Sequence, residues 1–340
     1  MVDQPLSVAA LNHGPGNPRN SEGAFVTLRD GRILFAYSRF EGDSGDDDGR
    51  AVIAALVSSD EGMTWKPWPR NLVEREGTQN VMSVSLLRLR DGRIAMFYGR
   101  KNSVADLQFY MRTSQDECQS WSEPVLCTRA LGYHVTNNDR VIQLADGALF
   151  MPATLHRTFT DENGLPHHDA RYGALDVRGQ NTFFRSDDGG ATWRNAGAWW
   201  ATPTGMTQET GVIELGDRSL YSWCRTDLGR QWSARSTDGG VTWSVPEATR
   251  FLSPISPMSM KRVSATGDLV AIWNDHDPRW NFSPSANLWA GRTPLAIALS
   301  HDDGATWNPS RLLEKDPERG YCYIAIHEIQ DALLLAYCCG

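Results

Sequence analysis

The stretch Ser186-Asp187-Asp188-Gly189-Gly190-Ala191-Thr192-Trp193 decides the fold, because its pattern Ser-x-Asp-x-Gly-x-Thr-Trp recurs along the chain. Further copies occupy residues 58–65, 236–243 and 300–307, and a weaker one residues 114–121. The Asp side chain can accept hydrogen bonds from the backbone N–H groups that follow it, and the Gly supplies a positive φ. The Trp begins the next strand as a large apolar anchor. Each copy therefore predicts a tight turn that ties a hairpin end to the core and has no direct part in chemistry.

The weaker copy departs from the pattern at two positions. Cys118 stands where the other copies have Gly, and Ser120 stands where they have Thr. A residue with a Cβ resists positive φ. We therefore expect this turn to be the most distorted of the five.

A second pattern, interleaved with the first, joins an apolar run, an Asp-Gly turn and another apolar run, which is a strong hairpin signal. It occurs at residues 28–34, 89–94 and 144–149, and in looser form at 215–220, 263–269 and 329–334. In the first five copies a strand-like stretch and then the Ser-x-Asp-x-Gly-x-Thr-Trp turn follow, so each repeat holds four strands. Repeats of about 50 to 70 residues with four strands each predict one all-β domain over residues 1–340, a six-bladed β-propeller of four-stranded antiparallel blades. The sixth hairpin ends at Gly340, so we expect residues 6–11 to supply an outer strand, and the N- and C-terminal strands to close the ring.

Composition agrees with this fold and excludes some functions. The 340 residues include 13 Trp, 30 Gly and 17 Pro, as expected for many short strands and turns. A formal net charge of −8 argues against a nucleic-acid partner, because binding phosphates requires a basic surface. No signal peptide or membrane-spanning run is visible, so we expect a cytoplasmic protein, or a secreted one if a leader has been removed. The six cysteines show no metal-site spacing and are too few for a disulfide scaffold, so we expect free thiols.

The Asp of each hairpin turn is a reference position from which equivalent residues of the innermost strands can be counted. Eight residues before it, the chain has Glu22, Ser83, Asn138, Glu209 and Tyr323, and the longer fifth turn gives Met260. Most of these positions are polar, whereas the strand interiors around them are apolar. In a propeller the innermost strands begin at the same end of the central channel, so this register predicts a ligand site there.

The third repeat begins its innermost strand with Asn137-Asn138-Asp139-Arg140. Asp139 is an alternative catalytic carboxylate, and Asn138 and Arg140 are candidate substrate-binding residues. Alternatively, Asp139 and Arg140 pair with each other on a solvated rim.

With these two patterns the chain resembles, over essentially its whole length, the sialidase-type propellers of the bacterial Asp-box kind. In that family an arginine triad binds the substrate carboxylate, a Tyr assisted by a Glu attacks the anomeric carbon, and an Asp serves as acid/base. The resemblance implies that Glu209 is the base, that Arg225 and Arg292 are the second and third triad arginines, and that Tyr323 is the nucleophile, with Tyr321 as the alternative.

The first repeat departs from the family. Sialidases carry Arg-Ile-Pro where this chain has Ser21-Glu22-Gly23, so the first triad arginine is absent at that register and Arg19 is its candidate replacement. Without a replacement, Glu22 would repel a substrate carboxylate. The acid/base is expected in the insertion at residues 41–48, whose four aspartates are Asp43, Asp46, Asp47 and Asp48, the last two nearest by count.

These roles predict a retaining exo-glycosidase of the exo-α-sialidase kind with a glycan substrate and no cofactor. An anionic anomeric centre repels a carboxylate nucleophile, so a neutral Tyr activated by a Glu takes its place. Taken singly, Glu209 and Arg225 could form a structural ion pair and Tyr323 could be a core residue, but their joint match favours catalysis.

Two other functions stay open. One is a neutral-sugar hydrolase or uronate lyase on the same scaffold, in which Glu22, Asp139 and His134 act as acid and base. The other is a non-catalytic sugar-binding propeller. The stretches at residues 167–169 and 275–277, each with His and Asp, look like fragments of a metal site, but no third ligand is indicated, so we expect solvated loops and no metal.

Overall fold

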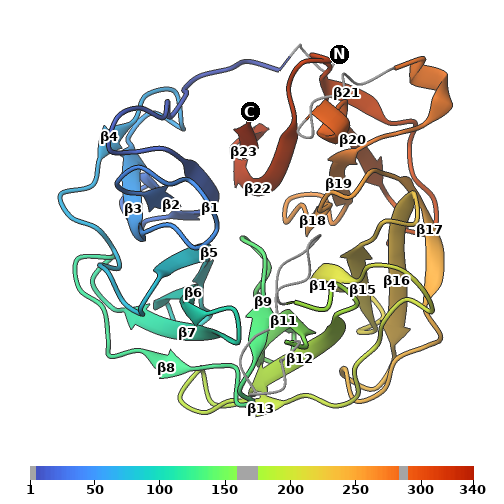
Figure 1. The fold of residues 1–340 in the computed structure, drawn as a ribbon, viewed down its shortest axis with the longest axis horizontal. Helices are drawn as coiled ribbons and strands as arrows, with labels where there is room; N and C mark the ends of the chain where they lie inside the picture. Colours follow the sequence, from blue (N-terminus) through green and yellow to red (C-terminus); the bar gives the residue numbers. More distant parts are fainter. Residues whose placement is uncertain (1–4, 159–174, 283–289) are drawn as a thin grey trace.

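The computed structural model describes residues 5–158, 175–282 and 290–340, which form an all-β structure (Figure 1). The first strands are β1 (Asn20–Thr27), β2 (Ile33–Phe40), β3 (Ala51–Ser58), β4 (Lys66–Pro67), β5 (Asn80–Arg88), β6 (Ile94–Ser103), β7 (Asp106–Ser114), β8 (Val125–Leu126), β9 (Tyr133–Val135), β10 (Ile142–Gln143), β11 (Leu149–His156), β12 (Gln180–Ser186) and β13 (Arg194–Asn195). The later strands are β14 (Gln208–Glu214), β15 (Leu220–Arg225), β16 (Arg230–Ser236), β17 (Glu247–Leu252), β18 (Ser259–Arg262), β19 (Leu269–Asn274), β20 (Leu295–Ser300), β21 (Arg311–Glu314), β22 (Tyr321–Ile329) and β23 (Ala332–Cys339). Two short 3₁₀ turns, η1 (Pro278–Trp280) and η2 (Ala290–Arg292), precede β20. No helix within these described ranges is long and apolar enough to cross a membrane.

Four-stranded antiparallel sheets recur along the chain. Their strand orders are β1-β2-β3-β4, β14-β15-β16-β17 and β18-β19-β20-β21. The strands β5 to β13 form one nine-stranded sheet, because β7 and β9 pair in parallel at Leu107 and Tyr133. The predicted all-β fold with four-stranded antiparallel units is therefore confirmed. In Figure 1 the sheets lie around a common centre, and β22, in red, lies near β1, in blue.

The last sheet contains only β22 and β23, and the predicted outer strand at residues 6–11 is wrong. Residues 5–13 contain no strand, and Leu6 is 73% exposed. The segment instead lies against the beginning of β1, where the Asn20 side chain donates hydrogen bonds to the carbonyls of Leu11 and Asn12 at 3.2 and 3.3 Å. These side-chain hydrogen bonds take the place of the strand pairing that we expected.

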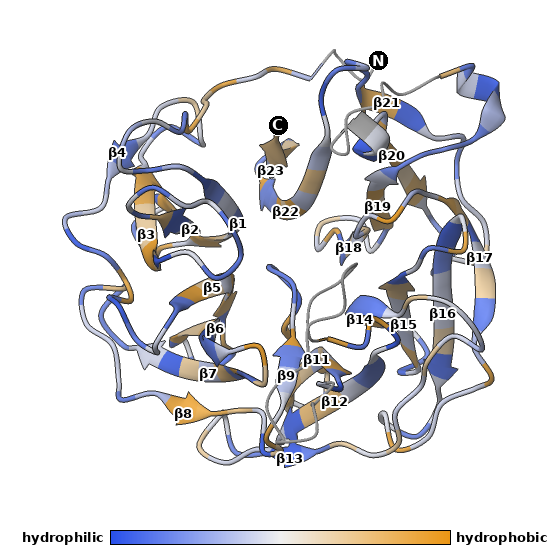
Figure 2. Cartoon of the chain, viewed as in Figure 1, coloured by the Kyte–Doolittle hydropathy of each residue, from blue (hydrophilic) through white to orange (hydrophobic). Residues whose placement is uncertain are grey.

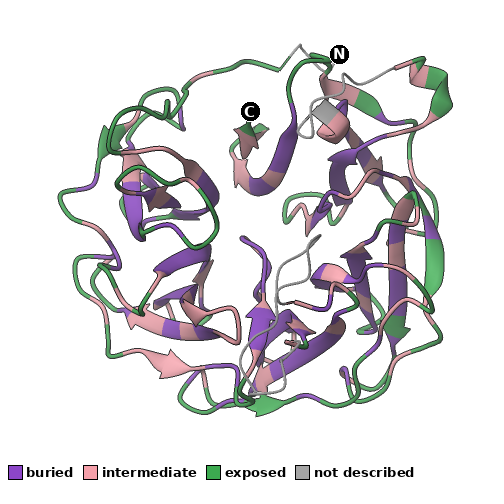
Figure 3. Ribbon diagram, in the orientation of Figure 1, coloured by how far each residue is buried: buried purple, intermediate pink, exposed green. Residues whose placement is uncertain are grey.

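The apolar core consists of clusters shared between neighbouring sheets. One cluster joins Leu34 and Ile53 of the first sheet to Met96 of the next, and similar clusters follow around the molecule. Phe25 and Phe35 of the first sheet share a cluster with Ala325 of the last. The strands are accordingly rich in apolar, buried residues, while the outer loops are polar and exposed (Figures 2 and 3). Burial of this apolar area between sheets is the main force that holds them together.

The turn at residues 186–193 has the predicted geometry. Asp188 accepts hydrogen bonds from the Thr192 backbone N–H at 2.9 Å, from the Thr192 hydroxyl at 2.6 Å and from the Ser186 hydroxyl at 2.8 Å. Gly190 has a φ of 96° and donates its N–H to Ser186 Oγ at 2.8 Å. Trp193 is buried. The turn is therefore closed by its own side chains and leaves no group for chemistry.

The weaker copy at residues 114–121 is not the most distorted, contrary to expectation. Cys118 adopts a φ of 67° and donates its N–H to Ser114 Oγ at 2.8 Å, as Gly190 does to Ser186. Ser120 donates its N–H to Asp116 at 2.8 Å and its hydroxyl to the same carboxylate. The geometry survives because Ser and Thr share the hydroxyl that the turn uses, and because the Cys118 thiol is buried in the core.

We expect Asp188→Ala to lower the free energy of unfolding by about 1 to 2 kcal/mol, because three donors lose one charged acceptor. Asp187→Ala is the matched control, since Asp187 is half exposed and only pairs with Arg185 and Arg194 on the surface. Its removal should cost less than about 0.5 kcal/mol. Urea denaturation of both variants measures the difference, and equal losses would contradict the assigned role of Asp188.

Candidate active site

Five repeats have a residue with left-handed backbone near the start of the innermost strand. These residues are Glu22, Ser83, Asp139, Glu209 and Tyr323, with φ values of 47°, 59°, 54°, 50° and 60°. Four of them occupy the register counted from the hairpin turns, and in the third repeat Asp139 takes the place expected for Asn138. In four of the strand pairs the register shifts at this point, as a β-bulge requires, whereas β18 and β19 pair without a shift at Met260. The bulge turns the side chain out of the sheet, so equivalent residues face the same region.

Contacts between sheets hold these bulges in place. Ser83 donates its N–H to the Ser38 hydroxyl of the first sheet at 3.1 Å. The Asn138 amide donates to the carbonyls of Gly23 and Tyr323 at 2.7 and 3.2 Å, and so joins the first, third and last repeats. A Cβ on Gly23 would lie 2.2 Å from Cζ of Phe35, so glycine is required beside Glu22.

Glu209 and Arg225 form a buried ion pair. Arg225 Nη1 donates to Glu209 Oε1 at 2.9 Å, and the two side chains are 13% and 11% exposed. The pair forms because Arg225 ends β15 opposite Gln208, next to the bulge of β14. Among the described residues, Glu209 Oε2 and Arg225 Nε have no hydrogen-bond partner. The pair therefore leaves one buried acceptor and one buried donor without a partner.

Tyr323 lies beside this pair. The Arg292 guanidinium carbon is 5.6 Å from the centre of the Tyr323 ring, and Arg292 Nη1 contacts Cys322 Sγ at 3.1 Å. Desolvation of the hydroxyl and the Glu209 carboxylate raise the pKa of Tyr323 well above its usual value, against the opposing charges of Arg292 and Arg225. Tyr323 is therefore a neutral phenol at physiological pH.

Arg19 and Asp47 complete the arrangement from the first repeat. Arg19 Nη1 donates to Asp47 Oδ1 at 2.6 Å, and Arg19 Nη2 donates to the Ser21 hydroxyl at 3.1 Å. Arg19 also interacts electrostatically with Tyr323. Desolvation alone would raise the pKa of Asp47, but the Arg19 charge and hydrogen bond, with Lys101 and Arg225, lower it below its usual value. Asp47 is thus the insertion aspartate that Arg19 contacts, and the role of Arg19 as replacement for the missing triad arginine stays a prediction.

Glu22 lies between these groups and is 6% exposed. Its Oε2 is buried and has no hydrogen-bond partner in the described part of the chain. Burial raises the pKa of Glu22 to about 8, with Arg19 opposing the shift and Asp47, Cys338 and Glu209 adding to it. Glu22 is therefore mostly uncharged at neutral pH, and the repulsion of a substrate carboxylate that we expected from it is absent under those conditions.

Sequence reasoning missed Lys101. Its side chain is buried, its Nζ donates to the Asp47 carbonyl at 3.1 Å and lies 5.3 Å from the centre of the Tyr133 ring. Asn80 supports the same loop by donating to the carbonyls of Asp47 and Gly49, both at 2.8 Å. Lys101 stands between Arg100 and Asn102 near the end of β6, so no local pattern singles it out. We call the set Arg19, Glu22, Asp47, Lys101, Glu209, Arg225, Arg292 and Tyr323 the central cluster.

The third-repeat candidates make structural contacts instead. Asp139 pairs with Lys261 at 3.2 Å and accepts the Ile326 N–H at 3.1 Å. Arg140 is 3% exposed and donates to the Met258 carbonyl at 2.6 Å, so the solvated rim expected for this pair is wrong. With Asn138 holding the backbone of Gly23 and Tyr323, the structure assigns none of the three a place in the central cluster.

Three further candidates lie outside the central cluster. Tyr321 packs against Tyr337 at 6.0 Å between ring centres. His134 is buried with its Nε2 3.0 Å from the Ala130 carbonyl, and burial lowers its pKa to about 4. Asp48 is exposed, as Asp47 is, but it forms no hydrogen bond or ion pair with the described residues and acts on Lys101 and Tyr133 only through its charge.

Of the two stretches that look like fragments of a metal site, only residues 275–277 lie within the described part of the chain. No group of three metal-ligating side chains exists among the described residues, and residues 167–169 lie outside them. Asp275 is buried, not solvated as expected, and accepts hydrogen bonds from Trp280 Nε1 at 3.0 Å and Ser310 Oγ at 2.7 Å. All six cysteines are free, as predicted.

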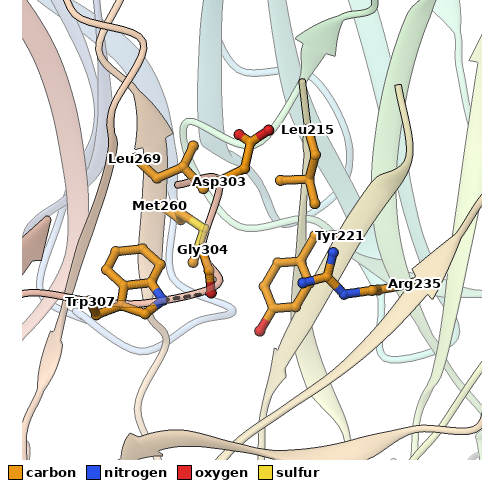
Figure 4. A pocket seen from close by; sticks show the side chains of 8 residues that line it. All are labelled: Leu215, Tyr221, Arg235, Met260, Leu269, Asp303, Gly304 and Trp307. Carbon is orange, nitrogen blue, oxygen red and sulfur yellow. Dashed lines mark hydrogen bonds between the residues drawn. The ribbon is translucent and has the colours of Figure 1, made fainter. Parts of the chain in front are cut away.

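Two cavities lie at the opposite, turn-bearing end of the strands. A cavity of about 20 Å³ sits between the fourth and fifth repeats, where the Trp307 indole donates to the Gly304 carbonyl and Arg235 stacks on Tyr221 (Figure 4). It has room for about one water and not for a sugar. An open hollow of about 330 Å³ is lined by Arg29, Asp91, Arg93 and Gln115. No residue of the central cluster lines either.

Comparison with known proteins identifies a matching family and a curated relative. Residues 69–335 match the family described as a BNR repeat-like domain. A protein of Bacteroides fragilis (strain YCH46) named sialidase is 24% identical over 235 residues, which are 65% of this chain and 37% of that protein. The chain thus matches well under two thirds of the length of this curated relative.

Solved structures share the fold. A protein of unknown function from Dyadobacter fermentans superposes with a TM-score of 0.72 at 17% identity, covering 96% of this chain and 91% of that one. A Trypanosoma rangeli sialidase in complex with the inhibitor DANA superposes with a TM-score of 0.68 at 15% identity, covering 96% of this chain and 53% of that one.

We expect Glu22→Gln to stabilise the protein more at high pH than at low pH. The folded chain holds a proton on Glu22 that the unfolded chain releases above pH about 4.3, so the stability of the wild type falls as the pH rises from there to about 8. Gln carries no charge at any pH and removes this loss. Thermal unfolding near pH 5 and near pH 9 measures the effect of Glu22→Gln on stability, with the exposed Glu318→Gln as control. An equal effect of Glu22→Gln at both pH values would contradict a raised pKa of Glu22.

Proposed function

The chain belongs to the BNR repeat-like family of the sialidase superfamily, and from that membership and the central cluster we propose that it is a retaining glycoside hydrolase acting on an anionic sugar. One observation carries this proposal. Tyr323 interacts electrostatically with Glu209, Arg292 and Arg225, and its ring lies beside the Arg292 guanidinium. The four residues come from three different repeats. A neutral tyrosine beside a carboxylate and two guanidinium groups is the arrangement that such a reaction requires.

We also infer that the sheets are six blades of a closed ring. Support comes from apolar clusters that link each repeat to its neighbour in chain order and link the last repeat to both the fifth and the first. A closed ring leaves no exposed sheet edge at its seam and gives the bulges a common central region.

In the proposed reaction Tyr323 is the nucleophile and Glu209 its base. The Tyr323 oxygen bonds to the anomeric carbon while its proton passes to Glu209, and the glycosidic C–O bond breaks as Asp47 protonates the leaving oxygen. Water, deprotonated by Asp47, then attacks the anomeric carbon and releases Tyr323, which recovers its proton from Glu209. Each step uses groups that the central cluster supplies, and the double displacement retains configuration.

We propose that the sugar carboxylate is bound by Arg19, Arg225 and Arg292, because planar guanidinium groups form paired, charge-assisted hydrogen bonds with a carboxylate. A carboxylate bound to Arg19 competes with Asp47 for the same guanidinium. Loss of the Arg19 hydrogen bond would raise the pKa of Asp47 toward the range of a general acid. Substrate binding would in this way prepare Asp47 to hold the proton that it donates.

We expect Tyr323→Phe and Glu209→Gln each to lower kcat/KM for a fluorogenic sialoside by at least about 100-fold. Tyr321→Phe is the matched control, since Tyr321 lies two residues away on β22 but outside the central cluster, and it should retain activity.

The same assay on neutral and uronic glycosides separates the alternatives. Inertness toward the sialoside with cleavage of another sugar would replace the anionic substrate by a neutral or uronic one. Binding of a sugar with no turnover would support a sugar-binding propeller instead.

We expect Asp47→Asn to slow hydrolysis of a natural sialoside more than that of a fluorogenic one, by about 100-fold against less than about 10-fold, because a poor leaving group needs the proton. Asp48→Asn, in the neighbouring exposed position, should leave both rates near the wild-type values. A larger effect of Asp48→Asn would reassign the acid.

A further inference from the structure

Glu22 is a buried carboxyl group held in a costly backbone conformation. Its φ of 47° is in the left-handed region, which disfavours a residue with a Cβ. The strand continues through Gly23, where no side chain would fit beside Phe35. The protein therefore holds this side chain at the central cluster, although a carboxyl on the surface would be more stable.

The groups around Glu22 come from every neighbouring element. Arg19 lies on its own repeat, Asp47 on the loop between β2 and β3, Glu209 on β14 and Cys338 on β23. Lys101 of β6 and Tyr133 of β9 also interact with it electrostatically. Glu22 thus faces two cations, two carboxylates, a thiol and a phenol, yet its Oε2 accepts no hydrogen bond from the described residues. An oxygen more than nine-tenths buried and lacking a donor disfavours the charged carboxylate, because no hydrogen bond replaces its lost hydration.

An anion is better accommodated beside a protonated Glu22 than beside an ionised one. The cations Arg19, Lys101, Arg225 and Arg292 already face the carboxylates of Asp47, Asp48 and Glu209, and a Cys338 thiol whose pKa is lowered to about 6 by its hydrogen bond with Cys322. Ionisation of Glu22 would add a further carboxylate next to the position of the incoming anion.

We propose that Glu22 binds the substrate as a protonated carboxyl, donating a hydrogen bond to the carboxylate of the sugar beside Arg19, so that binding of the anion requires a proton on Glu22. This inference rests on the proposed function. A neutral donor then takes the place of a guanidinium at this position of the site, and recognition of the sugar carboxylate depends on pH. The proton of Glu22 is shared with the bound carboxylate, and no covalent bond changes.

The affinity for a sugar carboxylate should therefore fall as Glu22 ionises. For the wild type we expect the Kd of DANA to rise about tenfold per pH unit above about pH 8, because each bound anion holds one proton. Glu22→Gln keeps an N–H donor and cannot ionise, so its Kd at neutral pH should stay within a few-fold of the wild type and should not rise in this way. Glu22→Ala lacks a donor and should bind about tenfold more weakly at neutral pH.

Calorimetric titration with DANA between about pH 6 and pH 10 tests the proposal. The methyl ester of DANA is the ligand control, since it carries no charge and its binding should not weaken above pH 8 as that of DANA does. The same pH dependence in wild type and Glu22→Gln would overturn the role of Glu22 and leave the proposed function standing. A dependence that disappears in Cys338→Ser but persists in Glu22→Gln would also overturn it, because the thiol would then be the titrating group.

A measurement without sugar separates this inference from the proposed function. Infrared difference spectra of wild type against Glu22→Gln should show the C=O stretch of a protonated carboxyl at neutral pH, and this band should disappear above about pH 8. Its absence at neutral pH would overturn the inference about Glu22 alone. Failure of DANA to bind either protein at any pH, with the band present, would overturn the proposed anionic substrate and with it this role of Glu22.

Discussion

The central cluster depends on a local constraint of the backbone, the left-handed residue near the beginning of the innermost strand in five of the repeats. Such a conformation costs roughly 1 to 3 kcal/mol for a residue with a Cβ, so it persists only where the surroundings hold it. Here the surroundings are neighbouring repeats, with the Ser38 hydroxyl on the N–H of Ser83 and the Asn138 amide on the carbonyls of Gly23 and Tyr323. The bulges direct Glu22, Glu209 and Tyr323 toward one region. Packing between the sheets offsets the free-energy cost of the left-handed residues.

Burial then determines how the charges of the central cluster behave. Glu209 and Arg225 share one hydrogen bond in a buried environment, so removal of either leaves the other charge without compensation. Arg19 and Asp47 form a more exposed pair, which a competing carboxylate can break at lower cost. Tyr323 and Glu22 are both kept neutral by desolvation, although they lie among charges. The site therefore combines fixed charges, one exchangeable ion pair and two uncharged acids.

Much of this arrangement follows from repeated short patterns. The eight-residue turns and the Asp-Gly hairpins predicted four-stranded antiparallel units, and counting from the hairpins found four of the five left-handed positions. The count missed Asp139 by one residue, because the third innermost strand is reduced to β10 and its loop differs from the others. The expected strand at residues 6–11 failed for a different reason, since an apolar run says nothing about which edge is within reach.

The sequence by itself determined the turns, the strand repeats and the identity of the polar residues at the start of the inner strands, because these depend on contacts within a few residues. Only the tertiary structure decided which of those residues meet. Arg19 and Asp47 are 28 residues apart and Asn138 and Tyr323 are 185 apart, and no local pattern encodes such contacts. It also decided protonation, since the charge of Glu22 depends on water excluded by other repeats and on cations they contribute. The stretch at residues 186–193 thus specified where each unit turns, while the packing of whole units specified the chemistry at their other end.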